Sequence, residues 1–220
     1  MRDAYHDELD AITEQLVDMA HLVGAAISSA TSALLTADLT TAESVIDGDA
    51  TVNELRDNIE RRTVDLIARQ QPVAGDLRVL TTGLRSTSDL ERSGDMAVHV
   101  AKLARRRFPN QAVPAELQEP IWQMGFAAEG MVEKVAAVLR TRDLSLALQL
   151  EADDDVIDEL HKNLLLTMLA SDWRHGVDTA IDLALAGRYY ERFADHVVSV
   201  ARQVVYLVTG ETPLQLEKRG

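Results

Sequence analysis

Two short segments of this chain each place a pair of carboxylates four residues apart. The first, SDLERSGDMAVHVAKLA, contains Glu91 and Asp95, and the second, RYYERFADHVVSVARQV, contains Glu191 and Asp195. On a helix, residues four apart share a face, and two like charges there are mildly destabilising. The spacing therefore indicates either a solvated acidic face or a site that binds a cation.

The apolar residues around each glutamate favour an inward-facing position. Steps of seven through the two segments give two regular series: Leu77, Leu84, Glu91, Val98; and Val177, Ala184, Glu191, Val198, Val205. This spacing is typical of a helix face that packs against other helices. Small residues beside each glutamate (Thr87 and Gly94; Gly187 and Ala194) leave space next to it. A carboxylate in such a place is costly unless an arginine or a metal ion meets it.

Further oxygen ligands are predicted on the helix that precedes each glutamate. Asp49 and Asn53 lie four apart in DGDATVNE, and Asp154 and Asp158 occupy the aligned places in EADDDVIDE. Oxygen ligands suit hard cations or iron. The Glu-x-x-His pairs of di-iron bundles do not occur at these places. Geometry alone leaves metal binding and buried arginine–glutamate pairs as open alternatives.

The elements that position these residues are predicted to be six long helices. Apolar residues recur at steps of three and four, and no alternating strand pattern is convincing. Turn-forming residues interrupt the pattern at 36–43, 70–75, 108–114, 141–143 and 171–176, and the last helix stops before Gly210. We therefore predict an all-α fold with three helices on each side of residues 108–114.

The two halves of the chain also match each other. NELRDNI, which begins at Asn53, aligns with DELHKNL, which begins at Asp158, at a displacement of 105 residues. Glu91 aligns with Glu191 at a displacement of 100. We predict two tandem, internally duplicated three-helix bundles, residues 1–108 and 115–210, followed by a C-terminal tail, 211–220.

Composition narrows the classes of function. The chain has 220 residues, a formal net charge of −14 and no cysteine. The acidic charge disfavours nucleic-acid binding, and the lack of cysteine excludes disulfides and thiolate metal sites. We see no signal peptide and no apolar run that approaches the length of a bilayer span, so we expect a cytoplasmic protein without direct membrane insertion. No nucleophile motif or phosphate-binding loop is present, so we expect no enzyme.

Three other features have simpler interpretations than ligand binding. The basic run Arg105-Arg106-Arg107 is expected to place favourable cations at a helix C-terminus. His99 and His196 lie near the acidic pairs, and we expect them to be hydrogen-bonded or solvent-facing rather than outer ligands.

Over essentially its whole length the chain resembles the PhoU family of phosphate-transport regulators. The resemblance is carried by QQPVAGDLRVL, DLERSGDMAVHVAKLA, DATVNELRDNI and YYERFADHVVSVAR, in the family's order and with its internal duplication. It implies two related three-helix bundles whose acidic motifs hold multinuclear iron or another metal such as Zn, Mg or Mn. The implied ligands are Asp49, Asn53, Glu91 and Asp95 in one half and Asp154, Asp158, Glu191 and Asp195 in the other.

The resemblance also implies a role in signalling. It predicts a negative regulator of phosphate-starvation signalling and phosphate uptake, an adaptor between the nucleotide-binding subunit of a phosphate ABC transporter and a membrane sensor histidine kinase. Such a protein would be cytoplasmic and would reach the inner face of the membrane through its partners. The alternatives are a metal-free dimeric helical scaffold and a carboxylate-bridged metalloenzyme. The helix faces rich in Ala and Gly favour a homodimer.

Overall fold

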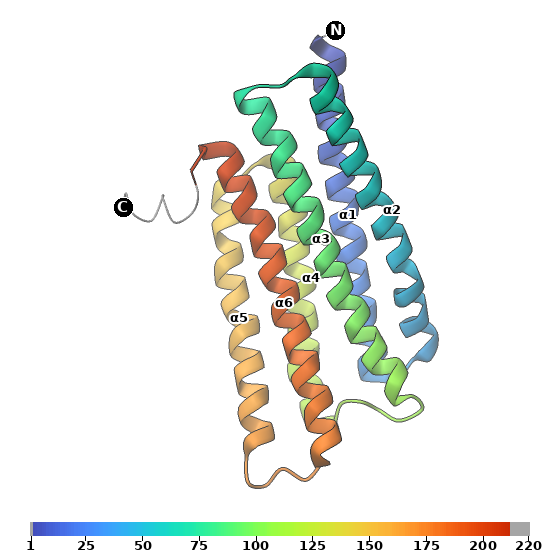
Figure 1. Ribbon diagram of the computed structural model, residues 1–220. Coiled ribbons are helices and arrows are strands. Elements are labelled where there is room, and N and C mark those ends of the chain that lie inside the picture. Colours follow the sequence, from blue (N-terminus) through green and yellow to red (C-terminus); the bar gives the residue numbers. More distant parts are fainter. Residues whose placement is uncertain (1, 212–220) are drawn as a thin grey trace.

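The computed structural model describes residues 2–211, and these residues form six α-helices and one 3₁₀ turn without any strand. The predicted all-α fold is confirmed (Figure 1). Met1 and residues 212–220, which make up nearly all of the predicted C-terminal tail, lie outside the described residues. The elements are α1 (Arg2–Thr36), α2 (Leu39–Gln70), α3 (Ala74–Arg107), η1 (Ala115–Leu117), α4 (Gln118–Thr141), α5 (Leu144–Leu169) and α6 (Gly176–Thr209).

The helix boundaries fall where the turn-forming residues predict them. Asp38 caps α2, because its Oδ1 accepts a hydrogen bond from the backbone N–H of Thr41 at 3.1 Å. Asp143, its aligned counterpart, caps α5 through the backbone N–H of Ser145 at 2.8 Å. Helix α6 ends at Gly210, whose φ of +74° is a left-handed conformation that glycine adopts without strain. Asp38 and Asp143 thus cap the second helix of each half in the same way.

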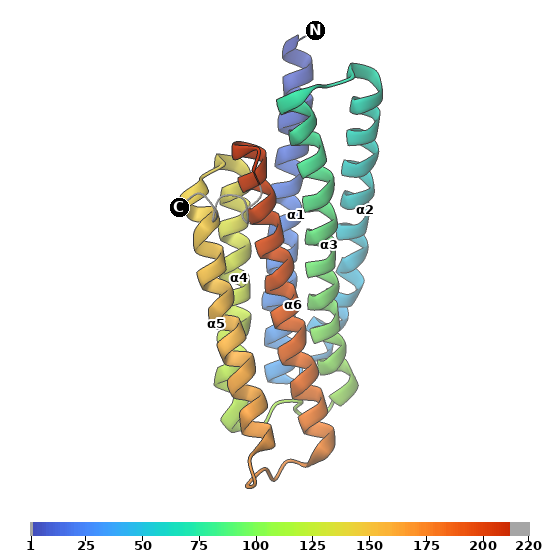
Figure 2. The same cartoon turned by 60° about the vertical axis from the view of Figure 1, so that its left-hand side comes forward.

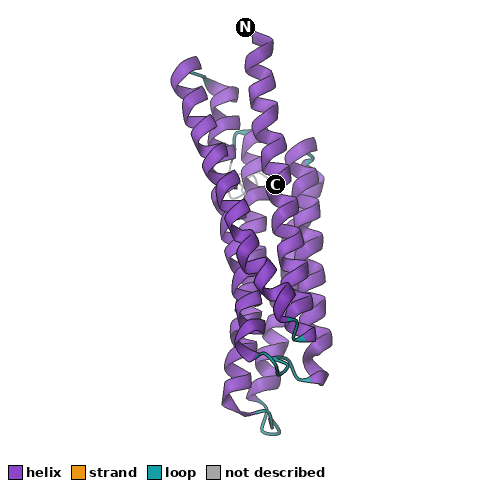
Figure 3. Ribbon diagram, turned by 90° about the vertical axis from the view of Figure 1, so that its right-hand side faces the viewer, coloured by secondary structure: helices purple, strands orange, loops and turns teal. Residues whose placement is uncertain are grey.

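The two halves, α1–α3 and α4–α6, lie side by side along one long axis (Figures 1 and 2). Helix α1 packs on α4 and α3 packs on α6, so both halves contribute to one continuous hydrophobic core. Figure 3 shows that helices account for almost the whole molecule and that short loops join them. The division into residues 1–108 and 115–210 stays a prediction about the repeat, since the halves share their core.

The halves are offset along that axis, so each has an end that projects beyond the other (Figure 2). Leu77 and Val177, in the first turns of α3 and α6, lie at these ends and are exposed. The prediction that both belong to the buried helix face is wrong for this reason. The core begins about one turn later in α3, at Leu80, and nearly two turns later in α6, at Leu183.

Several polar contacts join the halves through this core. The hydroxyls of Thr31 and Tyr190 lie 2.8 Å apart, and the complete burial of Tyr190 raises the pKa of its phenol. On α3, one carboxylate oxygen of Asp89 lies 3.1 Å from His196 Nδ1, and the other accepts a hydrogen bond from Gln203 Nε2 at 2.7 Å. Buried polar groups are costly unless paired, so these contacts favour one specific packing of α3 on α6.

The basic run at the end of α3 has a specific partner. Arg106 and Arg107 both form ion pairs with Asp182, whose side chain is 6% exposed near the start of α6. The expected role of these arginines at a helix C-terminus is thus accompanied by a contact that fixes the end of α3 against α6.

Helix α1 is the one helix within the described residues that is long and apolar enough to cross a membrane by length and composition. Polar residues such as Asp18 and His21 interrupt this helix, so the expectation of no direct membrane insertion stays a prediction. Half of its most apolar stretch is buried inside the protein, where α1 contacts α2, α3 and α4. Its apolarity is the composition expected of a helix enclosed by three others.

Candidate metal sites

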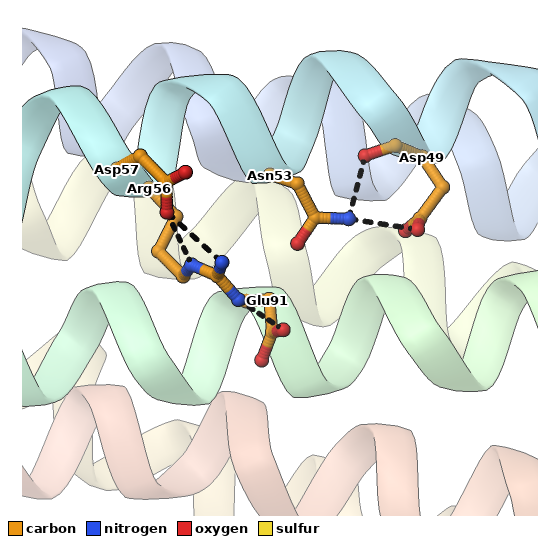
Figure 4. Close-up of polar contacts among 5 residues, drawn as sticks. All are labelled: Asp49, Asn53, Arg56, Asp57 and Glu91. Carbon is orange, nitrogen blue, oxygen red and sulfur yellow. Dashed lines mark hydrogen bonds and ion pairs between the residues drawn. The ribbon is translucent and has the colours of Figure 1, made fainter.

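In the first half, the four predicted ligands lie on the facing helices α2 and α3, and three of them already make polar contacts within the protein. Asn53 Nδ2 donates to Asp49 Oδ2 at 2.8 Å and to the Asp49 backbone oxygen at 3.1 Å (Figure 4). Glu91 Oε1 accepts a hydrogen bond from Arg56 Nη1 at 2.7 Å. Asp95 is half-buried one turn further along α3.

Glu91 therefore meets an arginine from the neighbouring helix, which is one of the two alternatives left open by the sequence. Its side chain is 19% exposed and that of Arg56 is 30% exposed. Arg56 also donates from Nε and Nη2 to Asp57 Oδ1, at 3.1 and 2.9 Å. These hydrogen bonds, with the charges of Asp57 and Glu91, raise the pKa of the guanidinium, which stays charged. Figure 4 shows the guanidinium between the two carboxylates.

In the second half, the four predicted ligands influence one another electrostatically across α5 and α6. Burial first, and then the charges of Asp158 and Asp195, raise the pKa of Asp154 to about 6. Burial, and then Glu191 and Asp195, also raise the pKa of Asp158. Such shifts mean that the ionised carboxylates lie close enough to repel one another. The structure therefore brings Asp154, Asp158, Glu191 and Asp195 together.

Among the described residues, two oxygens of this group, Asp154 Oδ1 and Glu191 Oε2, are buried without a hydrogen bond, and of the two only Glu191 Oε2 has an ion pair. Asp154 Oδ1 is buried and makes no hydrogen bond within the described part of the chain. Asp158 and Asp195 are exposed, so the group opens to solvent on one side. A buried acceptor without a partner is unusual in a folded protein and is expected to bind a cation or a donor that enters from solvent.

The structure adds His161, which the sequence interpretation missed. Its Nδ1 lies 3.1 Å from Glu191 Oε2, and Arg188 contacts the same oxygen from one turn earlier on α6. His161 follows Asp154 and Asp158 at steps of four and three, which places all three on one face of α5. The alignment of DELHKNL with NELRDNI contained the signal, because it sets His161 opposite Arg56.

Gly187 makes room for this histidine. A Cβ built at Gly187 would lie 2.6 Å from His161 Cδ2, closer than two carbons approach without a shift. The space predicted beside Glu191 thus belongs to the imidazole. Gly94 differs, because a Cβ there would make ordinary contacts with Val23 and Val52.

The donor sets of the two halves suit a metal ion to different degrees. Within the described residues, no three Asp, Glu or His side chains are arranged as ready ligands for one ion. In the second half, a histidine and four carboxylates, two of which have a buried oxygen without a hydrogen bond in the described part of the chain, have the chemistry that hard cations and iron require. In the first half, a neutral amide and a permanent cation replace two of these donors. The donors of the second half are therefore chemically closer to what a metal ion requires than those of the first half, and metal binding at either motif stays a prediction.

The other two histidines near the acidic pairs contact different groups. His196 faces Asp89, as described above, although it directly follows Asp195. His99 stacks on Tyr189, with ring centroids 5.0 Å apart and planes inclined by 17°. These contacts agree with the interpretation that neither histidine is an outer ligand.

The fold and sequence have clear relatives. The family model described as the PhoU domain matches residues 16–104 and again residues 121–204. The "Phosphate-specific transport system accessory protein PhoU homolog 2" of Mycobacterium tuberculosis is 41% identical over 213 residues, covering 97% of this chain and 100% of the relative. A PhoU homolog of Aquifex aeolicus is 38% identical over 207 residues, covering 93% of this chain and 92% of its own.

Solved structures show the same architecture. PhoU from Pseudomonas aeruginosa superposes with a TM-score of 0.83 at 29% identity, covering 94% of this chain and 100% of that one. The phosphate transport system regulatory protein PhoU from Streptococcus pneumoniae gives a TM-score of 0.85 at 26% identity, covering 94% and 98%.

Proposed function

The chain belongs to the PhoU family, and we propose that it is a negative regulator of phosphate-starvation signalling and phosphate uptake. The observation that carries the proposal is the similarity of nearly the whole chain to accessory proteins of phosphate-specific transport systems, with the PhoU domain matched twice. An accessory, regulatory role in phosphate transport follows from this family membership. The family is one of accessory proteins rather than enzymes, and we propose no catalytic activity.

The finer part of the proposal concerns partners. The protein acts as an adaptor between the nucleotide-binding subunit of a phosphate ABC transporter and a membrane sensor histidine kinase. A net charge of −14 supports partners with basic faces, and it disfavours nucleic acid and an anionic lipid surface. The protein is thus proposed to be cytoplasmic, to work as a homodimer, and to reach the membrane through its partners without insertion.

A metal ion is the second element of the proposal. Asp154, Asp158, Glu191 and Asp195 would hold it, and a cation there would neutralise the mutual repulsion of the carboxylates. Iron, or Zn, Mg or Mn, suits such oxygen donors. The runner-up is a metal-free helical scaffold, which the Arg56–Glu91 ion pair favours for the first half.

The adaptor role is tested by direct binding. The purified full chain is expected to retain both the transporter's nucleotide-binding subunit and the cytoplasmic part of the kinase in a pull-down, with loss of binding at high salt if charge drives it. Deletion of the gene is expected to leave phosphate-starvation genes expressed in high phosphate. Binding to neither partner, together with normal repression in the deletion strain, would overturn the role.

The metal is tested by elemental analysis of protein purified without a chelator or an affinity tag. An Asp154→Ala/Glu191→Ala variant is expected to lose the bound metal, because each change removes a charged donor. Glu159→Ala, an exposed acid on the same helix, is the matched control and keeps it. Equal metal content in all three proteins would contradict the site.

A further inference from the structure

We infer that the guanidinium of Arg56 occupies the place of a metal ion in the first half, so the two halves of the repeat neutralise their acidic motifs by different means. The inference extends the proposed metal binding of the second half. At the position where α5 presents His161 to Glu191, α2 presents Arg56 to Glu91.

The contacts of Arg56 make it a fixed cation. Its Nη1 lies 2.7 Å from Glu91 Oε1, and its other two nitrogens hold Asp57 at 2.9 and 3.1 Å. It therefore bridges α2 to α3 while Asp57 anchors it from its own helix (Figure 4). Charge-assisted hydrogen bonds of this kind are among the strong ones, and arginine does not lose its proton. A divalent ion beside Glu91 would have to displace this group and would be repelled by it.

Two of the remaining donors of the first half, Asp49 and Asn53, contact each other. Asn53 occupies the place of Asp158, and its Nδ2 donates to Asp49 Oδ2 at 2.8 Å. The amide therefore serves as a donor to Asp49, and it adds no negative charge. One carboxylate fewer and one guanidinium more give the first motif, with Arg56, a formal charge of −2, against −4 for the second with a neutral His161.

The second half lacks this arrangement. Lys162 stands where Asp57 stands in the first half, and it contacts Glu159 at 3.1 Å, so no acidic neighbour anchors a cation there. A neutral histidine can donate nitrogen to a metal, which arginine cannot. Arg188 does contact Glu191, but its side chain is 48% exposed and comes from the same helix. Its ion pair with Glu191 lies within α6, whereas Arg56 joins α2 to α3.

A transplant of the second-half residues tests the inference. The background is an Asp154→Asn/Glu191→Gln variant, in which the second-half site is removed. Arg56→His and Asn53→Asp are then introduced together, and binding of Mn²⁺ is measured by calorimetry and by elemental analysis after desalting. We expect no bound Mn²⁺ in the background and about one bound Mn²⁺ per chain in the transplant.

Two further variants complete the design. Arg56→Gln, which keeps the length of the side chain without its charge, is expected to gain weaker Mn²⁺ binding in the same background. Arg62→His is the matched control, because Arg62 contacts Gln15 rather than the acidic motif, and it is expected to gain none. Circular dichroism checks that each variant keeps its helices.

The outcomes separate the inference from the proposed function. Bound Mn²⁺ in the background variant, or none in the folded transplant and Arg56→Gln, would overturn the inference. If the wild-type chain binds no metal but the transplant does, the metal site proposed for the second half fails while the role of Arg56 stands.

Discussion

Replacement of Asp182 with alanine is expected to lower the free energy of unfolding by about 2 kcal/mol. The side chain is 6% exposed and pairs with both Arg106 and Arg107, so the change removes the anion that two cations share. Removal of one partner from a fully buried pair costs more, about 3–5 kcal/mol. Here the arginine side chains are 54% and 30% exposed, so they regain water and the loss is smaller.

Urea unfolding followed by circular dichroism measures this effect. Asp178→Ala, an exposed acid one turn earlier on α6, is the matched control and is expected to change stability little. Asp182→Asn keeps the shape and one acceptor, and is expected to fall between the two. An alanine variant as stable as the wild type would mean that the pair does not hold α3 against α6.

The helices themselves were predictable from the sequence because their signals are local. A cap such as Asp38 contacts backbone three residues away, and its counterpart Asp143 repeats the pattern 105 residues later. Glycine and proline breaks likewise act on the residues next to them. Periodicity therefore sufficed for six helices and for the all-α fold.

The sequence predicted which residues form the acidic motifs, but it did not predict which side chains contact them. Spacing placed the acidic residues on the right pairs of helices, α2 with α3 and α5 with α6. The cation that meets each glutamate depends on the register between two helices, which spacing along one helix does not set. Arg56 and His161 were visible in the repeat alignment, but their contacts with Glu91 and Glu191 appear only once the helices are packed.

The ion pairs of Asp182 with Arg106 and Arg107 were also not predictable, because these residues are far apart in the sequence. Its partners lie 75 and 76 residues away, and the basic run of α3 has an adequate explanation in the helix C-terminus alone. The exposure of Leu77 and Val177 has a related cause, because the offset between the halves is a property of the assembled bundle. Contacts between halves are therefore where the sequence interpretation was incomplete.

A change of Asp154 to asparagine is expected to stabilise the metal-free protein at pH 7.5. Burial and the neighbouring acids raise the pKa of this carboxyl from its ordinary value of 3.8 to about 6. The folded state thus holds the proton more tightly than the unfolded state does. Stability from this group is greatest below about pH 4, falls as the pH rises towards 6, and stays lower above it. Asparagine avoids that loss.

The expected gain at pH 7.5 is about 1 kcal/mol, or roughly 3 °C in Tm. A change in pKa from 3.8 to about 6 would correspond to about 3 kcal/mol without screening, but the group is only partly buried and water screens much of the repulsion. Thermal unfolding in the presence of a chelator measures the gain. Glu159→Gln, an exposed acid on the same helix whose charge does not contribute to the raised pKa of Asp154, is the control and is expected to change the Tm little.

Two conditions decide whether this gain comes from carboxylate repulsion at a cation site. At pH 4 the Tm difference between wild type and Asp154→Asn is expected to vanish, because the wild-type carboxyl is then protonated in the folded state. With excess Mn²⁺ at pH 7.5 the order is expected to reverse, since the ion stabilises the folded state only where its donors are intact. A gain that persists at pH 4 would point to packing instead, and a wild-type Tm that does not rise with Mn²⁺ would separate the repulsion from any role in metal binding.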